Sequence, residues 1–384
     1  TNGENNLYVT HQFTYENKFF EYLQPTISST IGETTVNHFG DAYNTSQVKD
    51  QLHYNKLYNK VGAIYENKTL GSFHFFLDDF RYNYYYGTII FLENQPIPNA
   101  LSDKINDFGA EYHYRKDKWK ANLSYTNSIT KQSLTNIEGK LSYTFNPKNE
   151  IDFSYQNTNK LPDHVYNLHQ SAFVAYNWYN SFKNEKINTI LANANTQWAT
   201  ASLQISNFDS HLYFSDDSSD KDIQLISPKQ YEKSIQYLSL KVGKEIKYWK
   251  IALDNTILYQ QVSQDDEIIN VPKIVTRNTL YFSDYFFTRA LYLQTGVTFN
   301  YFTKHYANGY NPILTDFFVQ NQQKIGDFAN LDFFINARIR QTRIFLKAEH
   351  FNSSMAAQNT FYSAPNYPYR DFIVRFGLVW NFFQ

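Results

Sequence analysis

The chain has 384 residues, with no cysteine, a formal net charge of −1 and a mean hydropathy of −0.55, although 18% of its residues are aromatic. The lack of cysteine excludes disulfides, thiolate metal sites and cysteine nucleophiles. The balanced charge gives no basic surface and disfavours nucleic acid as a partner. No stretch approaches the roughly 18 uncharged apolar residues that a membrane helix requires.

Segments in which every second residue is apolar, with single polar exceptions such as His11 and Asn255, follow one another along the chain. They cover residues 7–15, 61–65, 73–77, 108–114, 119–125, 137–145, 151–155, 249–259, 291–301, 331–339, 344–348 and 372–382. Because successive side chains of a strand point to opposite faces, each segment predicts a strand with one apolar face and one mixed or polar face. In the last segment the apolar face consists of Phe372, Val374, Phe376, Leu378, Trp380 and Phe382.

Such strands predict an all-β fold, a transmembrane antiparallel β-barrel of about 16 to 18 strands that forms a single domain over residues 1–384. Lipid cannot satisfy an open sheet edge, so spanning strands must close into a barrel. We expect short periplasmic turns near residues 67, 117, 147, 184, 246, 287, 326 and 341. Longer extracellular loops are expected at 23–50, 87–104, 158–168, 209–230, 263–272 and 352–368.

The alternative is a soluble β-sandwich, propeller or solenoid, in which the apolar faces would be buried between layers. Leu, Ile and Val would then be expected to dominate over the 33 Tyr and 33 Phe, and the turns would be expected to use more than 13 Gly and 10 Pro. The rows of aromatic residues therefore favour the membrane barrel, whose interfaces collect Tyr, Trp and Phe.

Several motifs in the C-terminal third carry a family resemblance. They are the run from Asn278 through 281–284 to 298–301, the run Tyr306–Pro312, the run Pro365–Pro368 and the final strand from Arg375 to Phe382. These motifs resemble the β-barrel porin family of Bacteroidota outer membranes, best over residues 270–384. The resemblance implies recognition of the terminal strand by the outer-membrane assembly machinery, with Phe382 as the final aromatic residue. It also implies a longer N-terminus, so the sequence is expected either to lack N-terminal residues or to have lost a signal segment.

Charged residues occupy the polar face of the last three predicted strands. They are Asp332, Arg338, Arg340, Arg343, Lys347, Glu349 and Arg375. Inside a barrel, rows of mixed sign can line a pore and select polar solutes. The same residues can instead pair across strands and only stiffen the lumen. The sequence leaves both possibilities open.

Other candidate sites carry weaker signals. The acidic stretch 216–222 and the residues 265–267 lack the ligand order and the Gly of a calcium loop, so solvated loop tips are the better interpretation. The ten histidines show no metal-binding spacing, and no catalytic group can be assembled from the order of residues along the chain. We therefore predict no metal, no cofactor and no catalytic residues, with a surface enzyme as a minor alternative.

The sequence thus predicts a porin-like channel in the bacterial outer membrane for passive diffusion of small hydrophilic solutes. The alternative is a structural or accessory barrel of a larger envelope assembly, for which lipid-face interruptions such as Asn255 are natural contact points. Expected partners are outer-membrane lipid and lipopolysaccharide, the assembly machinery, and further copies or subunits of an envelope complex.

Overall fold

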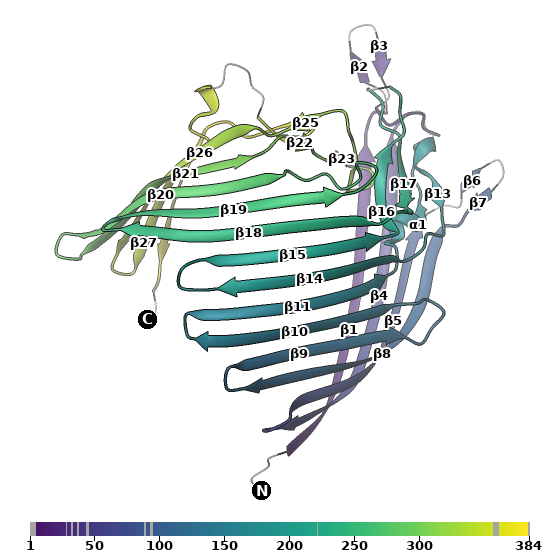
Figure 1. The fold of residues 1–384 in the computed structure, drawn as a ribbon. Helices are drawn as coiled ribbons and strands as arrows, with labels where there is room; N and C mark the ends of the chain where they lie inside the picture. The colour runs from purple at the N-terminus through teal and green to yellow at the C-terminus, as the bar shows by residue number, and fades with distance from the viewer. Residues whose placement is uncertain are drawn as a thin grey trace.

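A computed structural model of the chain describes residues 5–27, 29–31, 34–36, 38–43, 46–87, 90–92, 95–220, 222–355 and 361–382. Its main element is one antiparallel sheet of sixteen strands, which we call the wall (Figure 1). The wall strands are β1 (Asn5–Gln24), β4 (Val48–Asn67), β5 (Gly71–Tyr86), β8 (Ala100–Lys116), β9 (Trp119–Ser128), β10 (Thr135–Asn146), β11 (Asn149–Lys160), β14 (Glu185–Asn195), β15 (Thr200–Asp209), β18 (Ile235–Tyr248), β19 (Ile251–Ser263), β20 (Ile274–Phe286), β21 (Leu291–Phe302), β26 (Phe328–Ile339), β27 (Thr342–Glu349) and β30 (Ile373–Trp380). The predicted all-β antiparallel fold and strand number are confirmed.

The connections between the wall strands hold short elements. These are β2 (Ser29–Ile31), β3 (Thr34–Val36), β6 (Ile90–Leu92), β7 (Gln95–Ile97), α1 (His164–Asn167), β12 (Leu168–His169), η1 (Val174–Tyr176), β13 (Trp178–Tyr179), β16 (His211–Asp216), β17 (Ile226–Tyr231), β22 (His305–Tyr306), β23 (Gly309–Asn311), β24 (Asp316–Phe318), β25 (Lys324–Ile325), η2 (Ser353–Met355), β28 (Tyr362–Ala364) and β29 (Tyr367–Pro368). Among the described residues, no helix is long and apolar enough to cross a membrane.

The wall is a meander in which each strand pairs with the wall strands that precede and follow it along the chain. It curls into a trough, with short turns gathered at one end and long connections at the other (Figure 1). Strands β1 and β30 form the two edges, and they are not paired with each other in the described sheet.

Most short turns of the structure lie at the positions predicted from the sequence, and two predicted positions are wrong. Short turns follow β4, β8, β10, β20 and β26, as predicted. The turn expected near residue 246 comes slightly later, because β18 continues to Tyr248. The turns expected near residues 184 and 326 are wrong: both positions end long connections, 161–184 and 303–327, whose short β-bridged segments imitate strands in the sequence.

The two faces of the wall differ as the alternation predicts. On β19, Leu253 and Ile257 are exposed on the convex face, while Asp254 and Thr256 point to the concave face. On β30, Val374, Phe376, Leu378 and Trp380 are all at least half exposed. Many large apolar side chains of the wall are therefore exposed on its convex face, whereas a soluble protein would bury most of them.

Aromatic side chains collect where the strands meet the short turns. Trp119, Trp198, Trp249, Phe287 and Trp380 are all exposed at or beside the turn end of the wall. Aromatic residues in this position form the girdles of membrane barrels, because their rings are apolar and, for Trp and Tyr, also polar at one tip.

The apolar band ends before the long strands do. On the convex face of β5, Phe73, Phe75 and Leu77 are followed by Asp79 and Arg81. Asp79 pairs with Arg81 at 2.7 Å and with Lys104 of β8 at 3.7 Å. Strands β1, β4, β5 and β8 therefore continue past the expected hydrocarbon layer into water or lipid headgroups.

Candidate functional site: a cap and its pocket at the loop end of the trough

Four long connections meet at the loop end of the trough and form a structure that we call the cap. They are the described residues of 25–47, 161–184, 210–234 and 303–327, and Figure 1 shows α1, β13, β16, β17 and β23 gathered there. The cap has a hydrophobic core that consists of Ile27, Phe39, Val48, Phe173, Tyr176, Trp178, Phe214, Ile226, Ile313, Leu314 and Phe318. All of these residues except Val48 lie in the connections, so the conventional core of this molecule is the cap.

Backbone hydrogen bonds join the connections to one another. Val174 N–H donates to Asp41 O at 2.8 Å, and Tyr43 N–H donates to Ala172 O at 2.9 Å. Val319 N–H donates to Phe214 O at 2.7 Å, next to the parallel bridge between Ser215 and Val319. These bonds hold the connections against one another.

Asn311 joins three of the connections through one side chain. It is 0% exposed, and its Nδ2 donates to the Tyr176 hydroxyl at 3.0 Å and to Gln224 Oε1 at 3.2 Å. Its Oδ1 accepts from the backbone N–H groups of Ile313 at 3.0 Å and Leu314 at 3.1 Å. All the hydrogen-bonding capacity of the amide is therefore used inside the cap.

The cap is tied to the wall by polar contacts. Asp50, at the start of β4, accepts hydrogen bonds from Ser171 Oγ at 2.5 Å and Ala172 N at 2.8 Å. Tyr86 of β5 donates to Leu168 O at 3.3 Å. Glu185, at the start of β14, pairs with Lys160 at 2.9 Å and with His211. These contacts hold the cap within the trough along several strands.

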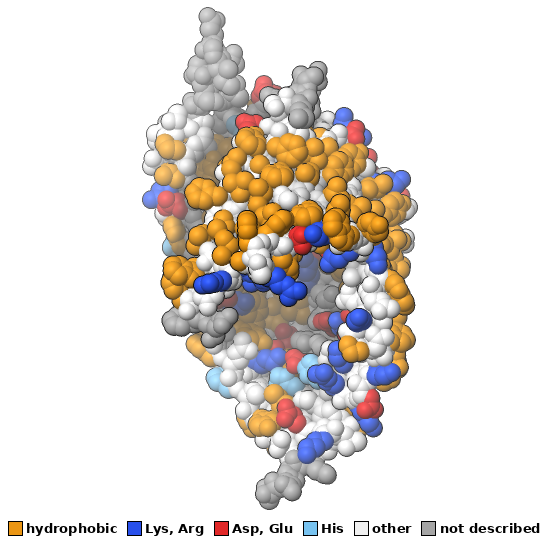
Figure 2. Space-filling model, turned by 90° about the vertical axis from the view of Figure 1, so that its left-hand side faces the viewer, with side chains coloured by type: hydrophobic (Ala, Val, Ile, Leu, Met, Phe, Trp, Pro, Cys, Tyr) orange, Lys and Arg blue, Asp and Glu red, His pale blue; other side chains and the backbone are white. Residues whose placement is uncertain are grey.

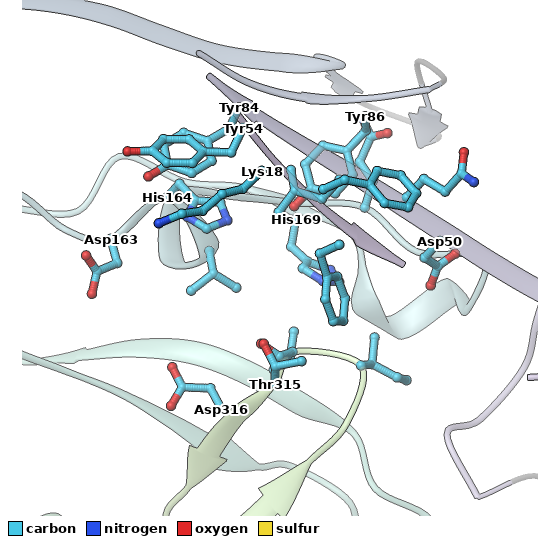
Figure 3. Close-up of a pocket in the computed structure, with 18 residues that line it drawn as sticks. Lys18, Asp50, Tyr54, Tyr84, Tyr86, Asp163, His164, His169, Thr315 and Asp316 are labelled. Atoms are coloured by element: carbon cyan, nitrogen blue, oxygen red, sulfur yellow. The ribbon is translucent and has the colours of Figure 1, made fainter. Parts of the chain in front are cut away.

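A pocket of about 510 Å³ lies between the cap and strands β1, β4 and β5, and we call it the cap pocket (Figure 3). Its wall side includes Lys18, Phe20, Tyr54 and Tyr84. Its cap side includes Asp163, His164, His169, Gln170 and the residues Ile313–Asp316. The pocket therefore lies on the concave face, near the loop end of the trough.

A stack of three rings dominates one side of the cap pocket. Tyr54 and Tyr84 are opposite each other in the β4–β5 register, with ring centroids 4.5 Å apart and an interplanar angle of 20°. The imidazole of His164 continues the stack, 3.8 Å from Tyr84 and tilted by only 7°. Figure 3 shows the three rings together, with Asp163 and Asp316 on the same side of the pocket.

Burial sets the charge of the cap residues around the pocket. It lowers the pKa of His164 and that of His169 to about 4, so both imidazoles are neutral at neutral pH. The Nδ1 of His169 lies 2.8 Å from Tyr176 O, within hydrogen-bond distance. Burial also raises the pKa of Asp316, against a hydrogen bond from Phe317 N–H, and the nearby charge of Asp163 adds to the rise.

Six of the seven predicted pore-lining residues, all except Arg340, lie on the same concave face as the cap pocket. Residues opposite each other on paired strands point to the same face of the sheet. When the pairing is followed from Tyr54 across the wall, strand by strand, Thr298 and its partner Asp332 fall on the face of Tyr54. On the next two strands, Lys347 lies opposite Arg375. Whether these residues line a conducting pore is not tested by their placement and stays a prediction.

Four of these seven residues form one charge network. Lys347 Nζ lies 3.4 Å from Asp332 and 2.9 Å from Glu349, and Glu349 lies 3.2 Å from Arg375. Arg370, which the sequence did not single out, approaches Glu349 at 3.9 Å. The charges are thus paired across strands and are partly accessible from the concave face.

The other three arginines lie apart from this network, near the turn end. Arg338 and Arg343 are opposite each other in the register, and Arg338 lies over the ring of Tyr292 at 5.5 Å. Arg340 lies in the turn after β26 with φ of 52°. It therefore does not belong to the facing rows in which the sequence placed it.

Four of the six residues predicted for the apolar face of the final strand lie within that strand in the structure. Val374, Phe376, Leu378 and Trp380 belong to β30 and are exposed opposite the face of Arg375. Phe372 and Phe382 are also exposed, but they flank the strand, which is shorter than expected.

The acidic stretch 216–222 forms the tip of the β16–β17 hairpin, with Lys221 outside the described residues. Asp217 pairs with Lys229 and accepts from Ser227 Oγ, while Asp216 accepts from the N–H groups of Ser218 and Leu225. Among the described residues, no group of three or more His, Asp or Glu side chains is arranged to hold a metal ion.

The comparisons with known proteins agree with this architecture. Residues 1–384 match the sequence model of a family described as "Putative porin". The chain belongs to this family. The predicted porin resemblance is thereby confirmed, and this porin-family chain has no match among the curated proteins.

Solved structures similar to this porin-family chain share its fold. The siderophore receptor PirA from Acinetobacter baumannii has a TM-score of 0.64 at 9% identity, over 96% of this chain and 59% of PirA. The copper transporter OprC has 0.58 at 10%, over 89% and 56%, and a mutant of the ferric enterobactin receptor PfeA from Pseudomonas aeruginosa has 0.57 at 11%, over 89% and 54%. This chain thus spans less than two thirds of the length of these structures. The family and the shared fold together support an outer-membrane β-barrel.

Proposed function

We propose that this protein is an outer-membrane channel of bacteria that admits small hydrophilic solutes by passive diffusion, with the cap as its size filter. The observation that carries the proposal is the contrast between the two faces of the wall. The convex face is apolar, while the concave face carries polar residues such as Asp254, Arg277 and Thr279, which line a hollow between neighbouring strands. Figure 2, viewed from the turn end, shows a central hollow with charged side chains near its rim and hydrophobic side chains over the outer surface.

The mechanism follows from the energy of transferring polar groups into lipid. A polar solute in hydrocarbon loses several kcal/mol for each unsatisfied group, and a water-filled trough removes that cost. The cap narrows the loop end, so solutes must pass beside it, and the charge network of Asp332, Lys347, Glu349 and Arg375 acts further along the wall. The names of the neighbours, a siderophore receptor and a copper transporter, support a transport role.

An open sheet cannot lie in lipid, so the two wall edges must be closed in the membrane. Strand β1 runs from the turn end to the loop end, and β30 runs in the opposite direction. Antiparallel closure therefore requires that β30 pairs directly with β1, or that an even number of further strands lies between them.

The expected partners follow from the convex face. We propose that lipid chains cover its apolar band and that Arg81 and Lys104, just beyond the band, contact lipopolysaccharide phosphates. Recognition of β30 by the assembly machinery and association with further copies or subunits remain parts of this proposal.

Single-channel recording in planar bilayers tests the function. Purified protein is expected to give open-channel steps, and Lys347→Gln with Arg375→Gln is expected to shift the reversal potential toward cation selectivity. Lys148→Gln, in the turn before β11, is the matched control and should not shift it. If no steps appear at any voltage, the channel proposal fails.

The second candidate is an accessory barrel without transport, which is favoured by the packed core of the cap. It predicts no conductance in the native protein and none after the cap is loosened. Swelling of liposomes that contain the protein, in isosmotic solutions of small sugars, separates the two candidates, since only a channel lets the sugar enter.

A further inference from the structure

We propose that the cap pocket binds a neutral cyclic saccharide, a mono- or disaccharide, with one sugar face against an end of the ring stack that Tyr54, Tyr84 and His164 form. The inference rests on the proposed function in that it names the class of solute which the channel would select. The volume of the cap pocket, about 510 Å³, falls within the roughly 300–1,000 Å³ of typical small-molecule sites.

The ring stack offers a flat surface at its ends, because Tyr84 lies between Tyr54 at 4.5 Å and His164 at 3.8 Å and both of its own faces are covered. Tyr54 and Tyr84 come from neighbouring wall strands, and His164 comes from α1 in the cap, so the stack exists only where cap and wall meet. The face of an aromatic ring is electron-rich and attracts partly positive hydrogens. The C–H groups on one face of a sugar ring present such hydrogens over a similar area.

The polar groups around the stack are mostly acceptors. Asp163 and Asp316 lie on the cap side of the pocket, as Figure 3 shows. Gln170 is 4% exposed, and its Nε2 donates to Pro98 O at 2.7 Å and Ile97 O at 3.4 Å, which fixes the orientation of the amide. Its buried Oε1 then has no hydrogen-bond partner among the described residues, although it belongs to a residue that lines the pocket.

An unpartnered buried acceptor is costly unless a ligand or water supplies a donor. Sugar hydroxyls can donate to Gln170 Oε1, Asp163 and Asp316 while they accept from Lys18. A ring with several hydroxyls therefore matches both the flat surface and the excess of acceptors.

Charge argues against the other classes of ligand. Three carboxylates, those of Asp50, Asp163 and Asp316, line the pocket against one ammonium, so an anion is disfavoured. An organic cation would take a place over the ring stack. The Nζ of Lys18 already lies 5.9 Å from the centroid of Tyr54, on that surface, and repels a second cation.

The test is direct binding to the purified full chain in detergent, measured by isothermal titration calorimetry. The probes are glucose, galactose, maltose and sucrose, with choline as the cation and inorganic phosphate as the anion. At least one neutral sugar is expected to bind, while choline and phosphate do not. Tyr84→Ala removes the ring that holds Tyr54 and His164 parallel, so it is expected to weaken that binding roughly tenfold, about the value of one aromatic contact.

Two further variants keep the test decisive if Tyr84→Ala loosens the cap. Tyr84→Phe retains the stack and should retain binding, and Asp163→Asn should weaken it without disturbing the rings. Tyr112→Ala, on β8 near the turn end, is the matched control and should bind like the native protein. Binding of choline without any sugar, or sugar binding unaffected by Tyr84→Ala and Asp163→Asn, overturns the inference.

The outcome is separable from that of the channel proposal. If the protein conducts but binds no sugar, only the saccharide inference is refuted. If the protein binds sugar but shows no conductance, or admits no sugar into liposomes, the pocket assignment holds and the channel proposal is refuted.

Discussion

Replacement of Asn311 by alanine should loosen the cap and leave the wall intact. The side chain accepts from two buried backbone N–H groups, those of Ile313 and Leu314, and donates to Tyr176 and Gln224. Each buried donor that loses its acceptor costs about 1–3 kcal/mol, so the two N–H groups together cost roughly 2–6 kcal/mol. That is comparable with the whole stability of a small packed unit.

Two measurements follow the loosening of the cap in the Asn311→Ala protein. Single-channel conductance should rise, because connections that narrow the loop end separate more often. Hydrogen exchange should speed up for amides of 161–184 and 303–327, while amides in the middle of wall strands should stay as protected as in the native protein.

The matched control is Asn149→Ala at the opposite end of the wall, where the side chain accepts an exposed hydrogen bond from Gln197 N at 3.1 Å. It should alter neither conductance nor cap exchange. The reasoning is refuted if Asn311→Ala leaves both readouts unchanged, or if exchange rises equally over cap and wall.

Three more predictions follow from the faces, the histidines and the edges. Ile257→Arg, on the convex face, should destabilise the protein in lipid by about 2–4 kcal/mol, while Thr256→Arg, one residue earlier and inward, should cost much less; equal costs in a denaturant titration in vesicles would contradict the assigned faces. Because the folded pKa values of His164 and His169 are lowered, the unfolded cap binds more protons between about pH 6.5 and 4, so cap stability should fall as pH falls through this window. Protease sensitivity of the cap should rise accordingly, less so in His164→Phe, and a pH-independent sensitivity would count against the burial of these rings. Amides on the free side of β1 should be protected from exchange in the membrane-embedded protein, and fast exchange there would show that the edge stays open.

The wall could be predicted because the alternation is local. Side chains of a strand alternate between its two faces with a period of two residues, and this holds whatever distant parts of the chain do. Leu346 and Lys347 were therefore correctly placed on opposite faces. Strand direction and neighbour order then follow from short turns, since a two- or three-residue turn forces adjacent antiparallel strands. The errors came from 161–184 and 303–327, where alternation is interrupted by Pro and Gly but resumes over two or three residues.

The cap could not be predicted by the same reasoning. Asn311, His164 and Tyr84 belong to segments far apart in the sequence, and their contacts depend on how the trough curls. No residue type among them is diagnostic by itself. The available signal was length: a connection longer than about 12 to 15 residues within a compact fold is usually functional or disordered. The sequence identified 23–50 and 209–230 on this basis, and both contribute to the cap core.

The molecule therefore contains two parts that are held together by different forces. The wall has few buried apolar side chains and is held by strand-to-strand hydrogen bonds, which lipid strengthens because it offers no competing donor or acceptor. The cap is held by burial of apolar residues from water, with Phe173 and Tyr176 fully buried at its centre. Agents that weaken hydrophobic association in water, such as mild urea, should thus open the cap well before they dissolve the wall. A channel that gains conductance reversibly in mild urea, and keeps its strand content, would show that the gate and the barrel unfold separately.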